Sequence, residues 1–117
     1  MDRNLREEVI QLHANVCSGI ADANRILLLY AVSESPHNVS ELSAALGIAQ
    51  PTVSRHLKIL RDRGLVAAHR EGKEVIYRIT DARIIQALDL MRAVMNAHLL
   101  NQAALAEDLP TNPGSPG

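Results

Sequence analysis

The sequence contains no tryptophan or phenylalanine, and apart from histidines its only aromatic residues are Tyr30 and Tyr77. Apolar residues still make up 47% of the 117 residues, enough for a core in a chain of single-domain length. That core must therefore be aliphatic. A lone cysteine, Cys17, excludes an internal disulfide framework.

Long hydrophobic runs are also missing, since none approaches the ~20 residues of a membrane span. The start of the chain, Met1-Asp2-Arg3-Asn4, lacks the basic-then-apolar layout of a signal peptide. These features predict a cytoplasmic protein with no membrane partner. No Ser/His/Asp arrangement, paired carboxylates or phosphate-binding loop is visible, so we expect no enzymatic activity and no cofactor.

The net charge is only −1, but the charges are unevenly distributed. Residues 50–80 hold seven cations and three anions, a net of +4, whereas the rest of the chain holds five cations and ten anions, a net of −5. A basic segment inside an acidic chain favours nucleic-acid binding by that segment.

Around the start of this segment the sequence predicts two helices joined by a tight turn. A short helix from Glu41 to Leu46, with Ser40 as its expected N-cap, ends at Gly47, and Pro51 suits the start of a second helix over residues 51–63. Such a pair is typical of a helix-turn-helix, whose second helix reads the major groove of duplex DNA.

The second helix has two faces. Val53, Leu57 and Leu60 form one face, which must pack on the domain. The opposite face carries cations and hydroxyls of the kinds that bond bases and phosphates, although an ordinary amphipathic surface helix would share this pattern. The expected DNA-binding residues of this region are Ser40, Gln50, Pro51, Thr52, Ser54, Arg55, His56 and Lys58.

Residues 66–79 then read as two strands around Glu71-Gly72-Lys73, because apolar and polar residues alternate with period two. A hairpin after a recognition helix is a wing. Arg70 and Lys73 at its tip are expected to reach DNA phosphates or the minor groove.

The run SELSAALGIAQPTVSRHLKILRDRGLVAAHREGKEVIYRIT resembles the DNA-binding core of the ArsR family of winged-helix repressors, which includes metal sensors. The earlier run ADANRILLLYAV resembles the family's ADPTRLRIL helix, with Ala23 where proline is usual. Asp22 is a plausible N-cap for that helix, whose Ile26–Leu29 run should lie centrally.

Two terminal helices are expected, one over residues 3–18 and one, capped by Asp81, over about residues 82–104. The last helix is apolar nearly all round, so it needs a partner. We predict a homodimer through these helices, which would present two recognition helices to a palindromic site, as the resemblance also implies. The expected interface residues are Leu5, Val9, Leu12, Val16, Ile84, Leu88, Met91 and Met95.

The resemblance implies that neither familiar metal site is intact. Where one family site has Cys-Val-Cys, this chain has Asn38-Val39-Ser40. At the site on the terminal helices Asp81 matches the first ligand, but Arg83, Val94 and Ala97 replace the others, and a guanidinium does not ligate metal.

Cys17, His13 and His98 remain as a possible sensor, either a metal site or a thiol switch across the dimer. Cys17 and His13 are one helical turn apart. The alternative is that Cys17 is a small packed side chain and the histidines are ordinary surface residues.

We therefore predict a mostly α-helical winged helix-turn-helix with a small β-hairpin wing in residues 1–106, followed by a disordered tail over residues 107–117. The expected function is sequence-specific binding of double-stranded DNA by a dimeric transcriptional repressor. Two alternatives stay open: derepression by metal or oxidant through Cys17, and a winged-helix module that binds proteins without DNA.

Overall fold

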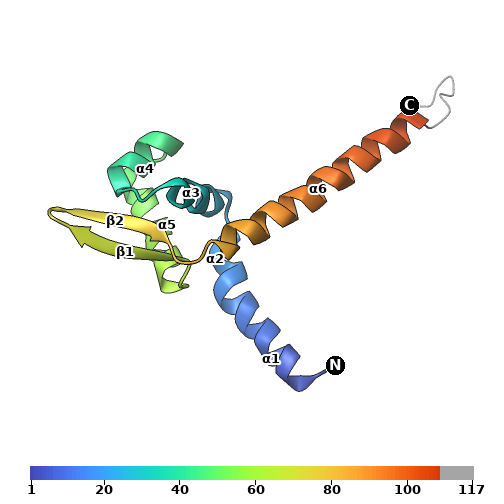
Figure 1. Ribbon diagram of the computed structural model, residues 1–117, viewed down its shortest axis with the longest axis horizontal. Coiled ribbons are helices and arrows are strands. Elements are labelled where there is room, and N and C mark those ends of the chain that lie inside the picture. Colours follow the sequence, from blue (N-terminus) through green and yellow to red (C-terminus); the bar gives the residue numbers. More distant parts are fainter. Residues whose placement is uncertain (109–117) are drawn as a thin grey trace. The chain divides into compact units, whose positions relative to one another are not determined.

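The computed structural model describes residues 1–108 and divides into two compact units, residues 1–85 and residues 86–117. Its elements follow one another as α1 (Arg3–Leu12), η1 (His13–Cys17), α2 (Ser18–Ile20), α3 (Ala23–Glu34), α4 (Val39–Leu46), α5 (Gln50–Asp62), β1 (Val66–Glu71), β2 (Glu74–Ile79) and α6 (Arg83–Asp108). The first unit holds the helix-turn-helix and the hairpin beside it (Figure 1). The mostly helical prediction with one hairpin is confirmed.

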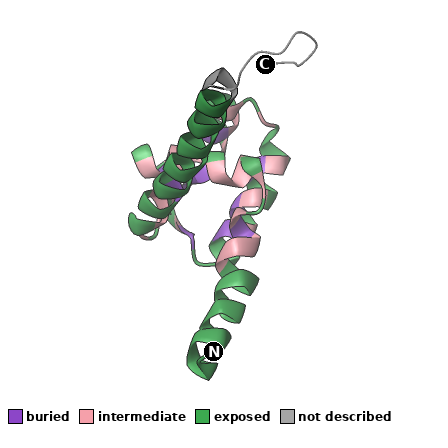
Figure 2. Ribbon diagram, turned by 90° about the vertical axis from the view of Figure 1, so that its right-hand side faces the viewer, coloured by how far each residue is buried: buried purple, intermediate pink, exposed green. Residues whose placement is uncertain are grey.

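The chain is helical without a break from Arg3 to Ile20, so the predicted helix over residues 3–18 is present, although its hydrogen bonding is not α-helical throughout. A π-helical turn, η1, separates α1 from the short α2. A π turn widens the spacing of the backbone hydrogen bonds and often marks a functional position. None of the α1 residues is buried, and the helix is exposed along its length in Figure 2.

The core of the first unit is aliphatic, as predicted. It is built by α3, α4, α5 and the hairpin from buried Leu28, Leu29, Val32, Leu42, Val53, Leu57, Leu60, Leu65, Val66 and Ile76. Asp22 caps α3 as expected, because its carboxylate accepts from the backbone N–H groups of Asn24 and Arg25. Leu27, however, is 48% exposed, so the run Ile26–Leu29 is only partly central.

The turn between α4 and α5 is closed by hydrogen bonds to Ser43. Gly47 adopts a left-handed φ of +67° and its N–H donates to the Ser43 carbonyl at 2.9 Å. The Ser43 hydroxyl donates to the carbonyl of Ile48. Because a left-handed conformation suits glycine, the predicted stop at Gly47 is confirmed.

Asn38, not Ser40, is the N-cap of α4, which corrects the prediction. Its side-chain oxygen accepts from the N–H of Glu41 at 2.8 Å, and the Glu41 carboxylate accepts from the N–H of Asn38 at 2.9 Å. This reciprocal pair is a capping box. Ser40 lies inside the first turn and is exposed.

The wing is an antiparallel pair in which Val66 faces Ile79 and Glu71 faces Glu74. It is joined to the start of α4 by a backbone bridge, in which His37 donates to Tyr77 at 3.1 Å and Tyr77 donates to His37 at 2.8 Å. The Asn38 amide also donates to Glu74 at 3.0 Å. These bonds tie the wing to the helix-turn-helix.

The helix α6 begins after Asp81, whose carboxylate accepts from the N–H of Arg83 at 2.9 Å, as expected of a cap. Most of its large apolar side chains are more than half exposed in the single chain: Leu90, Met91, Val94, Met95, Leu99, Leu100 and Leu105. The helix extends to Asp108, and residues 109–117 of the predicted tail lie outside the described residues.

No single helix among residues 1–108 is long and apolar enough to cross a membrane. The stretches Arg3–Ile20 and Ala23–Glu34 are long and apolar enough only when taken as a pair, and they are bent by 84° where they meet.

The capping box predicts a measurable loss of stability. We expect Asn38→Ala to lower the free energy of unfolding by about 1 kcal/mol, because an orphan N–H of α4 loses its acceptor. Urea unfolding at fixed protein concentration measures the change. Ser40→Ala is the matched control and should stay within about 0.5 kcal/mol of the wild type. Equal losses in both variants would contradict the assignment of Asn38 as the cap.

Candidate nucleic-acid interface

The two faces of α5 separate in the structure as the sequence predicts. Val53, Leu57 and Leu60 have no exposed surface, which holds the helix against the core. On the other side Gln50, Pro51, Ser54, Arg55 and Lys58 are all exposed. The buried stripe therefore turns the polar residues outward as one surface, which we call the α5 polar face.

Arg55 is held in place on this face by a neighbouring hydroxyl. Its guanidinium donates to the Thr52 hydroxyl oxygen at 3.2 Å, and Thr52 is half-buried. The bond directs the guanidinium toward the N-terminal end of α5, where a recognition helix meets base edges. A guanidinium can donate two hydrogen bonds to one guanine, so its direction matters for base recognition.

Lys58 is paired on the same face with Asp62, at 2.9 Å. The bond from Lys58 is the main reason that the pKa of Asp62 lies below its usual value. Both side chains are more than half exposed, at 69% and 54%, and such exposed pairs contribute little to stability. Lys58 can therefore exchange Asp62 for a DNA phosphate at small cost.

The wing presents further cations. Arg70 and Lys73 are exposed at its tip, and the Arg70 Nε donates to the Gly72 carbonyl at 3.4 Å. Gly72 takes a φ of +63°, which the tight turn requires. Arg78 pairs with Glu71 across the hairpin at 3.7 Å. Ser40 is also exposed, on α4.

His56 does not share the α5 polar face with the other predicted DNA-binding residues. Its side chain is only 14% exposed, and its Nδ1 lies 3.3 Å from the Arg25 guanidinium. Its Nε2 lies 3.9 Å from the Asp22 carboxylate. Because the ring is held by α3, we leave His56 out of the DNA-facing set.

Two arginines join separate elements in a way that the sequence did not predict. Arg25 of α3 bonds the backbone carbonyls of Gly19 and Ser18 in α2, and Arg63 bonds that of Ala14 in η1. Periodicity and charge give no signal for such bonds, because any arginine near a helix end would look the same. In the sequence Arg25 is only part of the run that resembles the ADPTRLRIL helix, and Arg63 is only the last residue of the predicted second helix and one of the cations of residues 50–80.

The positions that match family metal ligands are occupied by structural contacts. Asn38 is the cap of α4, and the Asp81 carboxylate is bound by the Arg83 guanidinium at 2.6–3.1 Å. This contact lowers the pKa of Asp81 to about 2. A metal ion at Asp81 would have to displace a guanidinium.

The predicted sensor residues are divided between the two units of the chain. His13 is exposed and Cys17 half-buried in η1, while His98 is exposed on α6 in the second unit. Among residues that the structure describes, no group of three His, Cys, Asp or Glu side chains could hold a metal ion. A role for Cys17 stays a prediction.

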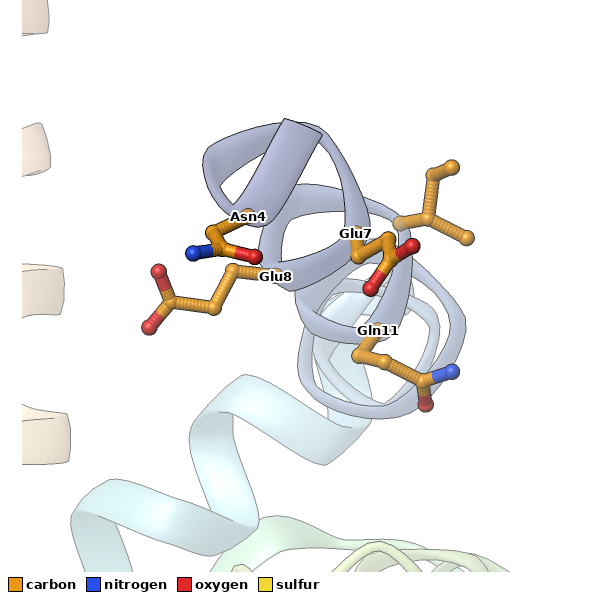
Figure 3. Close-up of a pocket in the computed structure, with 5 residues that line it drawn as sticks. Asn4, Glu7, Glu8 and Gln11 are labelled. Carbon is orange, nitrogen blue, oxygen red and sulfur yellow. The ribbon is translucent and has the colours of Figure 1, made fainter. Parts of the chain in front are cut away.

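A hollow on α1 offers no binding site. It is lined by Ile10 and by Asn4, Glu7, Glu8 and Gln11, which project from the same helix (Figure 3). Residues from one helix surface cannot enclose a ligand.

Known proteins share both this sequence pattern and this fold. The family described as "Bacterial regulatory protein, arsR family" matches residues 22–68. The biofilm growth-associated repressor of Xylella fastidiosa is 32% identical over 84 residues, which cover 72% of this chain and 74% of the relative. An HTH-type transcriptional regulator of Mycobacterium tuberculosis, Rv0081, is 34% identical over 104 residues, 88% of this chain and 91% of the relative.

Solved structures agree. The crystal structure of Rv0081 has a TM-score of 0.73 at 30% identity and covers 81% of this chain and 96% of its own. The solution structure of the homodimeric winged helix-turn-helix DNA-binding domain of Mb0332, from Mycobacterium bovis, has a TM-score of 0.72 at 27% identity, with coverage of 85% and 91%. These matches, together with the α5 polar face and the wing, show that the chain belongs to the arsR family of bacterial regulatory proteins and is a winged helix-turn-helix, DNA-binding transcriptional regulator.

Proposed function

We propose that this protein is a homodimeric repressor that binds a palindromic operator through α5 and the wing. The observation that carries the proposal is the α5 polar face, which joins Gln50, Ser54, Arg55 and Lys58 on one exposed surface of a helix packed by its other side. A relative that is 32% identical is itself named a repressor.

The apolar surface that the single chain leaves exposed supports self-association. Leu5, Val9 and Leu12 of α1 are 46%, 49% and 50% exposed, and they follow one another along one stripe of the helix. Met91 and Met95 of α6 are 53% and 54% exposed. Monomeric proteins rarely leave such contiguous apolar surface in water.

Not every predicted interface residue is available to a partner in the same degree. Val16 and Ile84 are half-buried, and Leu88 is only 5% exposed in the single chain. A second copy of the chain would cover the remaining exposed residues. One structural neighbour is likewise described as homodimeric. Two copies related by a two-fold axis would offer two α5 helices to two half-sites.

We infer that the signal for release from DNA is not a metal at the family positions, because Asn38 caps α4 and the Asp81 carboxylate is paired with Arg83 at the start of α6. Zinc, cadmium or arsenite at modest excess should therefore not release the protein from DNA by binding at these positions.

The α5 polar face predicts loss of base discrimination in Arg55→Ala. If Arg55 bonds a guanine edge, the preference for operator over random duplex should fall by roughly 1–3 kcal/mol per half-site. Lys73→Ala should weaken all duplexes about equally and reduce the salt dependence of binding, because it removes a phosphate contact. Titration of labelled duplexes at several salt concentrations measures both effects. Arg6→Ala, which removes an exposed cation from α1, is the control. Unchanged affinity and unchanged sequence preference in Arg55→Ala would refute this orientation of α5.

The exposed apolar stripes predict that a charge on them separates the subunits. Val9→Asp or Met91→Asp should yield a monomer that keeps its helical content but loses operator affinity, because an unpaired carboxylate cannot be buried without a large cost. Sedimentation equilibrium and circular dichroism measure these outcomes. Gln11→Asp, a charge on the polar side of α1, should remain dimeric. Wild-type protein that sediments as a monomer at micromolar concentration would contradict the proposal.

The Asp81–Arg83 pair predicts an acidic titration. The Asp81 side chain should titrate near pH 2 in the wild type, and Arg83→Gln should return the pKa toward its ordinary value of about 3.9. Because the folded-state pKa is lowered, the stabilisation by this pair is complete above the unfolded-state pKa and is lost as the pH falls toward 2. Carbon-13 NMR of the Asp81 carboxyl measures the midpoint, and equal midpoints in both proteins would show that Arg83 does not hold this carboxylate.

A further inference from the structure

Arg25, near the start of α3, bonds two other elements at once. Its Nε donates to the Gly19 carbonyl at 2.6 Å and one terminal nitrogen donates to the Ser18 carbonyl at 3.3 Å. These carbonyls lie at the end of the first helical stretch, where no further helical N–H follows to satisfy them. We call this stretch, Arg3–Ile20, the arm.

The other terminal nitrogen of Arg25 reaches the recognition helix. It lies 3.3 Å from His56 Nδ1, and since a guanidinium only donates, this ring nitrogen must be the acceptor. The His56 proton is then on Nε2, which faces Asp22 at 3.9 Å. Arg25 thus joins the arm and α5 through a single side chain.

A second bond joins the arm to the C-terminal end of α5. Arg63, the C-cap residue of α5, donates to the Ala14 carbonyl inside the π-helical turn at 3.1 Å. Between these two bonds the backbone of Gly19 lies close to the side chains of Leu65 and Arg63, since an added Cβ would lie 3.0 Å from Leu65 Cδ1 and 3.2 Å from Arg63 Cγ. The arm therefore meets α5 and the following turn at two polar bonds and one tight contact.

We propose that Arg25, His56 and Arg63 are positioning residues, which fix the arm against the recognition helix and so set the spacing of the two half-sites that a dimer can bind. This inference rests on the proposed dimeric repressor, because the arm carries the stripe Leu5, Val9 and Leu12 through which the second copy would bind. These three residues do not contact DNA bases themselves. They act by fixing the orientation of α5 relative to the arm.

The length of the arm makes the spacing sensitive to these bonds. A helical stretch of 18 residues is about 27 Å long, so a rotation of about 10° at its base moves its far end by roughly 5 Å. That displacement exceeds the rise of about 3.4 Å per base pair. The helix α5 is held in the core by Val53, Leu57 and Leu60, whether or not His56 is present. Mutation of His56 can therefore test the link to the arm separately from the packing of α5.

The test compares His56→Leu, which removes the acceptor for Arg25, with His56→Asn, whose side-chain oxygen can replace Nδ1. An operator selected from random duplex DNA with wild-type protein is remade with the spacing between half-sites changed by one and two base pairs, and a single half-site serves as reference. The wild type should prefer the selected spacing. In His56→Leu that preference should fall roughly tenfold, as expected for the loss of a hydrogen bond to a charged group, while the half-site affinity stays within about twofold. His56→Asn should restore the preference.

Arg63→Gln repeats the test at the second bond, with Arg61→Gln as the matched control. Both variants remove one exposed cation from the end of α5, but only Arg63 contacts the arm. Loss of the spacing preference in Arg63→Gln alone supports the inference, and this comparison decides the matter if His56→Leu does not fold.

Retention of the full spacing preference in His56→Leu, or in Arg63→Gln where His56→Leu does not fold, overturns the inference and leaves the repressor proposal intact. Failure of the proposed function has a different signature, because wild-type protein would then be monomeric or indifferent to spacing.

Discussion

The burial of one side of α5 is the constraint on which the rest of the structure depends. Val53, Leu57 and Leu60 are fully buried. Each such side chain contributes about 1.5–3 kcal/mol when it leaves water. Because the three residues define one stripe of a helix, their burial leaves only one orientation for Gln50, Ser54, Arg55 and Lys58. The DNA-facing surface is thus a consequence of core packing.

Polar bonds then place the neighbouring elements around this helix. The capping box at Asn38 and Glu41 starts α4, and the Asn38 amide also reaches Glu74 in the wing. The paired backbone bonds of His37 and Tyr77 add a second tie to the hairpin. Asn38, which stands where the family resemblance implied a cysteine ligand, therefore joins the helix-turn-helix to the wing.

The near absence of aromatic residues also has a structural consequence. An aliphatic core of this size leaves an apolar stripe of α1, Leu5, Val9 and Leu12, and most of the large apolar side chains of α6 exposed in the single chain. We infer that this surface is completed by a second copy. The arginines at the base of the arm would then connect the stability of the dimer to the geometry of DNA recognition.

The sequence by itself determined the element types, the aliphatic core, the wing over residues 66–79 and the buried face of α5, because these follow from periodicity and from glycine and proline at fixed positions. It misplaced the cap of α4, since Asn38 and Ser40 are both good N-caps and only the helix start decides between them. It also did not reveal the π turn inside the predicted helix over residues 3–18, because such a turn leaves no clear mark in hydrophobic spacing. Tertiary structure alone decided the role of His56: its place on α5 is local, but the Arg25 guanidinium that holds it comes from a residue 31 positions earlier in the chain.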